Sequence, residues 1–405
     1  MKYIMAIPDG AADSFKFYPD GNTPLKVANT PMMDELADHG EVGWAKTVPD
    51  HLPPGSDVAC LSIFGFNPAE VYTGRAPIEA ASLGIQLGDL HAFRCNLVTI
   101  QNGRMKEFTA GHISTDEASA LIDSLNEKIG IKEIRFYTGV QYRHILTTTA
   151  DYGQVSCTPP HDILDKEIEP YLPQGESRER ILELMRRSGE IFADHAVNRQ
   201  RIEQGKPPAT QIWLWGQGTE PQLPPYSERC GLTGGVISAV DLIRGIGKLA
   251  GLEVIHVPGA TGLMDTNYEG KADAALDVLS QQDFVCVHVE APDEMGHAGD
   301  EARKTQSLTD FDHRMLRRLI EGLRSTSTDF RILLLPDHPT PISLRTHVNE
   351  PVPFLLYDSR TSTRRGDTGY SEWGVRERTR RTLWGYRLLD VLAERALFED
   401  KTLYP

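Results

Sequence analysis

Three short apolar runs, far apart in the chain, predict buried strands that each end in acidic and histidine side chains. The runs cover residues 2–7, 284–290 and 331–335, and continuous apolar runs of this length are typical of strands buried on both faces. They lead into the sequences PDG, PDEMGH and PDH respectively. In an open α/β sheet, functional residues gather at the carboxyl ends of the strands. We therefore expect these polar clusters to share one crevice.

Helical patterns lie between the strands and complete the prediction of fold class. Residues 31–39 predict a helix with Thr30 as N-cap, Pro31 in the first position and Gly40 after the end. Residues 42–48 predict a further strand, and residues 234–257 a helix followed by a strand. The pattern predicts an α/β domain with a mostly parallel sheet and helices on both faces.

The segment GSDVACLSIFGF, residues 55–66, predicts a helix that begins near Ser56. The N-terminus of a helix is positive, so a serine there is well placed to meet an oxyanion or a phosphate. The alternative is an ordinary N-cap serine that bonds only to its own helix. This window alone leaves both interpretations open.

Residues 93–205 differ from the rest of the chain. They are rich in arginine and histidine, contain strand-like runs such as residues 143–149, and include a polar stretch over residues 176–205 that predicts one long helix. The sequence GKPPATQ then marks a boundary. We predict a main domain formed by residues 1–90 and 206–405, and a smaller inserted α+β domain, residues 91–205, that caps the site.

Composition narrows the classes of function. With 405 residues, 40% hydrophobic, the chain has enough apolar residues for a large core, and its length predicts two domains. The 42 basic and 57 acidic residues give a net charge of −15, which disfavours a nucleic-acid binder with a general basic surface. An anionic substrate would therefore need a local cluster of arginines.

Cysteine usage and apolar segments indicate the compartment. The five cysteines, at positions 60, 95, 157, 230 and 286, are far apart and form no CxxC pair, which disfavours a disulfide framework and a cysteine-based zinc site. The first residues lack a signal-peptide pattern, and no apolar stretch approaches the ~18 residues of a membrane span. We expect a cytoplasmic protein without a membrane partner.

The polar clusters offer ligands for two metal ions. Asp293 and His297 are four residues apart, which places them on one face of a helix. Asp337 and His338 are adjacent, and His347 follows nine residues later. Each pattern alone is also typical of a helix cap or turn. The whole set has three carboxylates, three imidazoles and one hydroxyl, from Asp9, Ser56, Asp293, His297, Asp337, His338 and His347.

Ligands of this mixed N/O character suit Mn²⁺ or Zn²⁺, and Mg²⁺ less well. Two metals about 3.5–4 Å apart form a clamp for in-line displacement at phosphorus. Ser56 is the candidate nucleophile. The expected chemistry is phosphoryl transfer or phosphate ester hydrolysis through a phosphoserine.

The longer motifs around these residues carry a family resemblance. They include PDGAAD, TPLKVANTPMMDELADHG, PPGSDVACLSIFGFNP, YTGRAPIEAASLGI, TNYEGKADAAL, VEAPDEMGHAGD and LLPDHPTPISLRTH, and such stretches cover nearly the whole chain in order. The chain resembles the cofactor-independent phosphoglycerate mutases, most closely the archaeal-type branch, within the alkaline phosphatase superfamily. The resemblance implies an alkaline-phosphatase-like fold.

The resemblance also implies a ligand set and a mechanism. One metal would be held by Asp293, His297 and His347, and the second by Asp9, Asp337, His338 and Ser56. Ionised Ser56 would take the phosphoryl group from one hydroxyl of phosphoglycerate and return it to the other after the glycerate reorients. No bisphosphoglycerate is needed. Two divalent ions are expected, with Mn²⁺ favoured and Mg²⁺, Zn²⁺ or Co²⁺ as alternatives.

Candidate substrate contacts come from arginine-containing motifs, because a phosphorylated acid needs bidentate partners. Arg75 could instead pair with Glu79 one turn on, Arg143 and Arg199 could be surface charges, and His112 could be a polar residue ahead of a helix. Lys271 resembles a family lysine near the transferred group. The candidates for substrate binding are Arg75, Arg94, Arg143, Arg199, His161 and Asp162, and the catalytic candidates beside Ser56 are His112 and Lys271.

One departure from the family pattern keeps the substrate open. WLWGQG, residues 213–218, stands where many archaeal members carry an arginine-containing run, and it resembles a branch for which a homoserine kinase role has been proposed. No P-loop motif supports use of ATP. The alternatives to the mutase are a homoserine kinase-like phosphotransferase, a metal-dependent phosphatase, and a non-catalytic protein, for which a broken ligand set would be expected. The sequence implies a small anionic phosphate ester as partner and indicates no oligomeric state.

Overall fold

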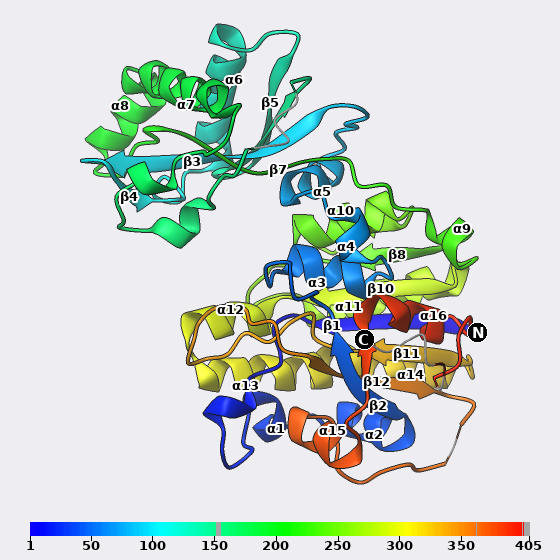
Figure 1. Ribbon diagram of the computed structural model, residues 1–405. Coiled ribbons are helices and arrows are strands. Elements are labelled where there is room, and N and C mark those ends of the chain that lie inside the picture. The colour runs from blue at the N-terminus through cyan, green and yellow to red at the C-terminus, as the bar shows by residue number, and fades with distance from the viewer. Residues whose placement is uncertain (151–154, 362, 399, 401–405) are drawn as a thin grey trace. The chain divides into compact units, whose positions relative to one another are not determined.

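The computed structural model of the chain describes residues 1–150, 155–361, 363–398 and 400. The chain forms two compact units (Figure 1): unit 1 comprises residues 1–72 and 222–405, and unit 2 residues 73–221. The predicted boundaries, after residues 90 and 205, both fall inside unit 2. They differ because α5 (Arg75–Ser82) packs on β3 (His91–Gln101), and β7 (Gln211–Thr219) pairs with β3.

Unit 1 is built on an eight-stranded sheet that is mostly parallel, as predicted. Only β12 runs antiparallel to its neighbours; the other adjacent strands are parallel. The order across the sheet is β13 (Thr382–Trp384), β2 (Glu41–Lys46), β12 (Val352–Asp358), β11 (Phe330–Leu334), β1 (Lys2–Pro8), β10 (Phe284–Val289), β8 (Gly234–Ile237) and β9 (Glu253–Ile255).

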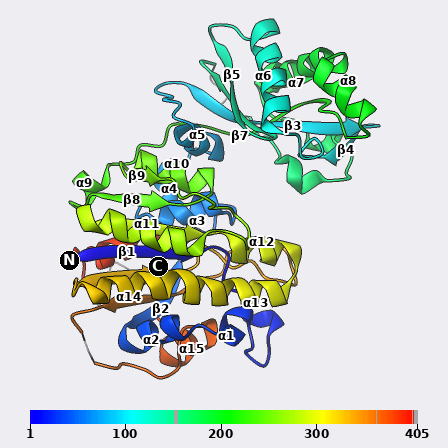
Figure 2. The same cartoon turned by 180° about the vertical axis from the view of Figure 1, so that it is seen from behind.

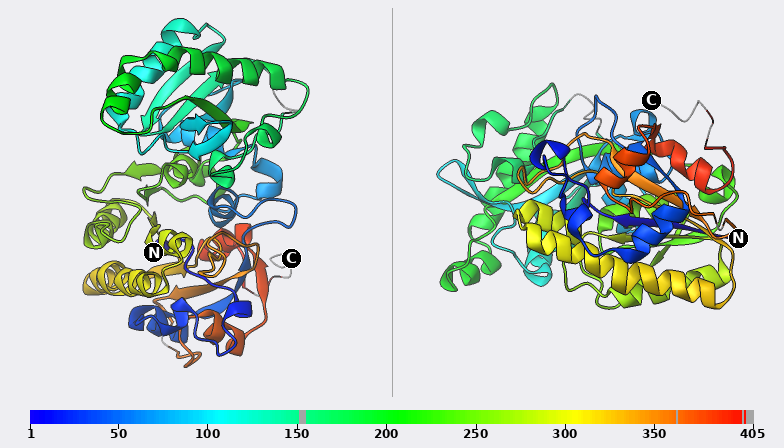
Figure 3. Two further views of the ribbon diagram at one scale, coloured as in Figure 1. Left: turned by 90° about the vertical axis from the view of Figure 1, so that its left-hand side faces the viewer. Right: turned by 90° about the horizontal axis from the view of Figure 1, so that it is seen from below.

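Both faces of this sheet are covered, so residues 4–7 of its central strand are apolar and buried. Ile4 and Ala6 share a core cluster with residues of the long helices, whereas Met5 and Ile7 point to the opposite face, and all four are fully buried. Figure 2 shows α11 (Tyr268–Gln281) and the run of α13 (Glu301–Asp310) and α14 (Arg317–Ser325) along one face. Figure 3 shows the yellow helices from their ends in the left view and along their length in the right view. The other face carries α3 (Ser56–Ile63), α10 (Asp241–Leu249) and α16 (Leu388–Leu392).

The predicted helix over residues 31–39 is confirmed as α2 (Pro31–His39), and Thr30 occupies the predicted N-cap position. Its side chain makes no capping hydrogen bond. Instead the Asp312 carboxylate, from η4 (Phe311–Leu316), accepts from the backbone N–H groups of Met32 (3.2 Å) and Met33 (2.7 Å). Tertiary packing therefore supplies the acceptor that a local N-cap would provide.

The expectation of a helix from residue 234 onward was wrong in its first part. The segment forms β8, then α10, then β9. A Cβ on Gly234 would lie 2.1 Å from the Phe284 carbonyl oxygen, so the glycine allows β8 to approach β10 closely. Two glycines without side chains concealed this strand from a pattern of apolar residues.

Unit 2 is an α+β unit with an antiparallel sheet, β4 (Arg104–Glu107), β3, β6 (Arg143–Thr148) and β5 (Ile134–Val140), to which β7 adds beside β3. The predicted long helix is two helices, α7 (Arg178–Ala193) and α8 (Ala196–Glu203). The break lies at His195, whose Nδ1 accepts from the Val197 N–H and caps α8. The other long helix is α6 (Thr115–Lys128).

The remaining elements are short. They are η1 (Phe15–Phe17), α1 (Pro24–Val27), α4 (Pro68–Val71), η2 (Pro160–Ile163), η3 (Glu169–Tyr171), α9 (Tyr226–Arg229), α12 (Ala291–Ala298), α15 (Glu372–Arg378) and η5 (Gly385–Arg387). Among the described residues, no helix has the length and apolarity that crossing a bilayer requires.

Substitution of Arg201 would test whether its buried hydrogen bonds stabilise unit 2. Its buried guanidinium donates to Pro207 O (3.0 Å), Ala110 O (2.6 Å) and Glu117 Oε2 (2.8 Å). We predict that Arg201→Met destabilises unit 2 by about 3–5 kcal/mol, because it leaves buried carbonyls without donors. Urea unfolding measures the effect. Arg199→Met is the matched control on the exposed side of the same helix, with an expected change within about 0.5 kcal/mol; equal effects of the two would contradict the prediction.

Candidate metal centre

The three predicted strand ends meet in unit 1, as the sequence indicated. β1 lies between β10 and β11 and is parallel to both, so the carboxyl ends of the three strands are neighbours. Asp9 follows β1, Asp293 lies in the first turn of α12 after β10, and Asp337 follows β11. All three carboxylates are at least 95% buried. Sheet topology thus brings together residues some 280 and 330 positions apart.

The first predicted ligand group converges at α12. His297 Nε2 lies 3.1 Å from Asp293 Oδ2 and 2.9 Å from His347 Nε2, and His347 Nε2 lies 3.5 Å from Asp293 Oδ1. His297 Nδ1 lies 3.0 Å from the Arg345 carbonyl oxygen, and donation to it leaves Nε2 facing the group. Atoms that share one ion at about 2.0–2.3 Å lie at comparable mutual distances of roughly 3–4 Å. Asp293, His297 and His347 therefore fit a single cation.

The second predicted group converges on the Nε2 atom of His338. Ser56 Oγ and Asp337 Oδ2 each lie 3.1 Å from it, and Asp9 Oδ1 lies 3.9 Å from it. Asp9, His338 and Asp293 also have ligand atoms within 4.8 Å of one another. Asp293 is thus common to both groups, which places the two candidate ion positions side by side.

The Ser56 hydroxyl is turned toward this group and not toward its own helix. Gly55 occupies the N-cap position of α3 and Ser56 the first helical position. The serine Oγ bonds with His338 Nε2 across 282 residues. The alternative interpretation, a serine that only caps its helix, is therefore wrong.

Backbone groups hold the centre in place. Asp337 Oδ1 accepts from the N–H groups of Gly10 (3.0 Å) and His338 (2.9 Å). Gly10 has φ of +60°, and a Cβ there would lie 2.4 Å from Asp293 Oδ1. The turn after β1 therefore requires glycine, because of both its conformation and the close approach of Asp293.

The charges of the centre favour bound cations. Burial and the nearby carboxylates of Asp337 and Asp293 raise the pKa of Asp9 well above its usual value. Burial acts to lower the pKa of His297, but its bond with Asp293 and the charge of that carboxylate raise it to about 9. Burial lowers the pKa of His338 to about 4, against the opposing effect of Asp337, so this imidazole is neutral and able to ligate.

An unsatisfied atom supports the fit to metal. Asp9 Oδ1 is buried and makes no hydrogen bond to any described residue. An unpaired buried carboxylate oxygen is rare in proteins and calls for an ion or another partner. The donors are imidazole nitrogens and oxygens without thiolate, which suits divalent first-row ions. The residues present therefore fit divalent cations.

Two supporting residues escaped the sequence analysis. His288 Nε2 lies 2.8 Å from Asp9 Oδ2, and its Nδ1 lies 3.1 Å from Ser238 Oγ. Thr340 Oγ1 donates to Asp293 Oδ1. The only sequence signal for His288 was a polar residue inside an otherwise apolar strand, FVCVHV. No local signal marked Thr340.

Lys271 is buried in α11 behind the centre. Its ammonium group donates to the His288 carbonyl oxygen at 2.9 Å, and burial lowers its pKa to about 8. The lysine thus contacts the backbone of the residue that bonds to Asp9.

The predicted substrate residues lie in unit 2, where two of the arginines share one carboxylate. Glu79 Oε1 accepts from Arg75 Nε (2.7 Å) and from Arg94 Nη1 (2.5 Å). Burial acts to raise the pKa of Glu79, but Arg94 and Arg75 lower it below its usual value. Burial lowers the pKa of Arg94 to about 10, so the guanidinium stays charged at neutral pH. The alternative pairing of Arg75 with Glu79 is therefore present, within a larger cluster.

The other candidates in unit 2 are more exposed. Arg143 is exposed, 5.4 Å from the Tyr142 ring, and electrostatically coupled to Arg94 and Glu79. Arg199 donates to the Asp194 carbonyl. His112 has φ of +53° and its N–H donates to Thr109 Oγ1. The remaining two, His161 and Asp162, are exposed neighbours, with a nitrogen–oxygen distance of 3.8 Å.

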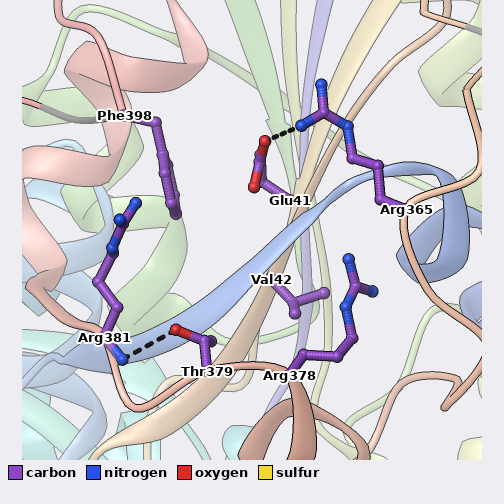
Figure 4. Close-up of a pocket in the computed structure, with 7 residues that line it drawn as sticks. All are labelled: Glu41, Val42, Arg365, Arg378, Thr379, Arg381 and Phe398. Carbon is purple, nitrogen blue, oxygen red and sulfur yellow. Dashed lines mark hydrogen bonds and ion pairs between the residues drawn. The ribbon is translucent and has the colours of Figure 1, made fainter.

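A cavity of about 470 Å³ lies elsewhere on unit 1 (Figure 4). Its guanidinium groups are already engaged: Arg365 pairs with Glu41, Arg378 donates to carbonyls at the end of α2, and Arg381 lies 5.1 Å from the Phe398 ring. These contacts explain the arginines as supports of the fold. The cavity is lined by Glu41, Val42, Arg365, Arg378, Thr379, Arg381 and Phe398, none of which is a predicted site residue.

The chain is similar in sequence to known proteins of one family. The model of a family described as 2,3-bisphosphoglycerate-independent phosphoglycerate mutase matches residues 37–198. A relative of that name from Methanosarcina barkeri is 52% identical over 363 residues, covering 88% of this chain and 90% of the relative. The chain belongs to the 2,3-bisphosphoglycerate-independent phosphoglycerate mutase family. A probable mutase of this family from Geobacter sulfurreducens is 47% identical over 98% of this chain and 100% of its own length.

Solved structures of similar proteins agree with this assignment to the mutase family. A protein from Pyrococcus horikoshii is 27% identical, with a TM-score of 0.80 over 99% of this chain and 100% of that one. A cofactor-independent phosphoglycerate mutase from Thermoplasma acidophilum is 25% identical, with a TM-score of 0.64 over 97% and 99% of the two chains. The fold is thus shared along the full length.

Gly10 provides a test of the centre's packing. We predict that Gly10→Ala weakens Mn²⁺ binding at least about tenfold, because the added methyl group would displace Asp293. Calorimetric titration of the metal-stripped protein measures this. Gly88→Ala is the control, since Gly88 also has positive φ (+53°) but has no atom within 4 Å of its would-be Cβ. Unchanged affinity in Gly10→Ala would contradict the packing described.

Metal uptake is predicted to release protons. His297 holds a proton up to a pKa of about 9 and must lose it to bind an ion through Nε2. The apparent Kd for Mn²⁺ should therefore fall about tenfold per pH unit between pH 7 and 9 for each proton displaced. Titration in two buffers of different ionisation enthalpy counts the protons. An affinity independent of pH over this range would contradict the assignment of His297 as a ligand.

Proposed function

We propose that the protein interconverts 3-phosphoglycerate and 2-phosphoglycerate through a phosphoserine on Ser56, without bisphosphoglycerate. The observation that carries this proposal is the Ser56 hydroxyl, 3.1 Å from His338 Nε2 within a set of seven candidate ligands. Relatives 47–52% identical over most of their length are named as mutases of this type, which supports the substrate.

The candidate ligands would hold two divalent ions, one with Asp293, His297 and His347 and one with Asp9, Asp337, His338 and Ser56. When bound, such ions neutralise phosphate charge and favour the ionised serine. Mn²⁺ is the ion we favour, on the mixture of imidazole and carboxylate donors.

The residues of this chain then perform a double displacement. The Ser56 hydroxyl gives up its proton and Oγ attacks phosphorus; the bond from phosphorus to one glycerate oxygen breaks, and that oxygen takes up a proton in place of the one that the serine released. After glycerate turns, its other hydroxyl loses a proton and attacks the phosphoserine, the P–Oγ bond breaks, and Oγ takes up a proton again. The Nε2 atom of the neutral His338 imidazole lies 3.1 Å from Ser56 Oγ, so that both atoms can face one ion. Position at the start of α3 adds the favourable helix dipole.

Unit 2 supplies the proposed substrate contacts. A carboxylate and a phosphate require cationic partners in a chain whose net charge is −15. Arg75, Arg94 and Arg143 form a group of cationic side chains that are electrostatically coupled around Glu79. His161, Asp162 and Arg199 remain predicted substrate contacts of this unit. His112 of unit 2 and Lys271 of unit 1 remain predicted catalytic residues. A capping role for unit 2, which would exclude water from the phosphoserine, follows from the same requirement.

A product assay separates the mutase from its alternatives. Metal-stripped protein is supplied with 3-phosphoglycerate and Mn²⁺ and no bisphosphoglycerate, and 2-phosphoglycerate is measured. Metal-dependent conversion supports the proposal. Release of inorganic phosphate alone would identify a phosphatase, and phosphorylation of homoserine by ATP would identify the kinase.

Ser56→Ala tests the nucleophile. We predict a loss of conversion of at least about a thousandfold, since the proposed double displacement passes through a covalent bond to Ser56 Oγ. Ser62→Ala is the matched control: Ser62 lies on the same helix, is buried, and its hydroxyl makes no hydrogen bond to a described residue. Ser62→Ala should retain near-normal activity. Full activity in Ser56→Ala would eliminate the phosphoserine route.

A further inference from the structure

Trp215 contacts the shared-carboxylate cluster of unit 2 and has no role in the steps above. It stands on β7 directly opposite Arg94 of β3. The Arg94 guanidinium carbon lies 4.8 Å from the indole centroid, and that of Arg75 lies 5.8 Å from it. One aromatic ring thus contacts both guanidinium groups that bond to Glu79. Cations over an indole face within about 6 Å are attracted by its quadrupole.

A β-bulge aims Trp215 at these arginines. Ala92 pairs with Gly218 and Arg94 with Trp215, so two steps on β3 oppose three on β7. Gly216, next to Trp215, has φ of +61°, the conformation that the bulge requires and that glycine adopts without cost. Bulges of this kind redirect a side chain beside a functional site.

The indole N–H group of Trp215 also has a hydrogen-bond partner. Trp215 Nε1 donates to Asn96 Oδ1 at 3.1 Å, and Trp215 and Asn96 are 6% and 1% exposed. The ring of His161 meets the indole edge-on, with centroids 5.3 Å apart. The indole therefore has a single fixed orientation, in contact with three of the predicted substrate residues.

Arg94 has donors that remain available for an anion. Its guanidinium has five N–H donors, and its only hydrogen bond among the described residues goes to Glu79. Its Nε is buried and has no acceptor among the described residues. An unpaired buried donor on a charged guanidinium calls for an acceptor, and a carboxylate is a suitable one.

We propose that Trp215 is the positioning residue that fixes Arg75 and Arg94 to receive the carboxylate of the substrate. This inference rests on the proposed function. While the phosphoryl group is on Ser56, the carboxylate is the only charge left on the glycerate. Binding of the carboxylate alone keeps the glycerate in the site while its two hydroxyls exchange places. If this binding is lost, the glycerate dissociates and water hydrolyses the phosphoserine.

The test compares Trp215→Leu with Trp215→Phe in the Mn²⁺-loaded full chain. Trp215→Leu removes the aromatic face, and we expect KM for 3-phosphoglycerate to rise about tenfold while kcat falls less than about threefold. We also expect the fraction of turnovers that end in inorganic phosphate to rise at least about fivefold, as glycerate escapes before the return step. Trp215→Phe retains a face and should recover most of both losses.

Trp213 provides the matched control on the same strand. Its Nε1 donates to the Thr158 carbonyl oxygen at 2.8 Å within the apolar core of unit 2. Trp213→Phe should leave KM and the phosphate fraction unchanged even if it lowers thermal stability. The proposal is overturned if Trp215→Leu keeps wild-type KM and phosphate fraction, or if Trp213→Phe changes both as Trp215→Leu does.

A binding measurement separates this inference from the proposed activity. In Mn²⁺-loaded Ser56→Ala protein, calorimetry with 3-phosphoglycerate should show affinity about tenfold weaker after Trp215→Leu. If the wild type binds 3-phosphoglycerate but does not isomerise it, the proposed function fails and this comparison still decides the role of Trp215. If the Ser56→Ala protein does not bind 3-phosphoglycerate, the inference fails as well.

Discussion

The structure depends on one electrostatic constraint: three buried carboxylates lie together with four imidazoles, those of His288, His297, His338 and His347, at the carboxyl ends of β1, β10 and β11. Buried carboxylates repel one another, and their ionisation is disfavoured unless cations compensate. The raised pKa of Asp9 reflects this cost, and His297, with its pKa of about 9, provides a partial balance. The residues that would hold the ions are therefore the ones whose charge requires them.

The surroundings of the centre reduce its freedom. Gly10 allows Asp293 to approach the turn after β1, and two backbone N–H groups hold Asp337. His288 bonds to one oxygen of Asp9, and the other oxygen has no hydrogen bond to a described residue. In unit 2 the neighbouring like charges are positive. Arg75 and Arg94 repel each other, and both bond to the Glu79 carboxylate and lie against the Trp215 ring.

Sequence reasoning succeeded where the signal was local and failed where it was not. Apolar runs found β1, β10 and β11, and a Pro-to-Gly pattern found α2. The cap of α2 came instead from Asp312, some 280 residues away, which no local pattern could reveal. The apolar pattern missed β8 because that strand begins with two glycines. The polar stretch predicted one long helix, but the chain forms two, α7 and α8, with a break at His195. Because β7 pairs with β3, β7 belongs to unit 2, and the second boundary of this unit lies beyond the predicted residue 205.

The sequence by itself determined the fold class, the candidate ligands and the family motifs, because residue type and spacing along one strand or helix set both periodicity and ligand chemistry. Only the tertiary structure decided how those residues combine. It showed that the Ser56 hydroxyl faces His338 instead of its own helix, that Asp293 belongs to both ligand groups, and that Arg75 and Arg94 share Glu79 beneath Trp215. These contacts join segments far apart in the chain, and sheet order and a bulge, not local propensity, bring such segments together.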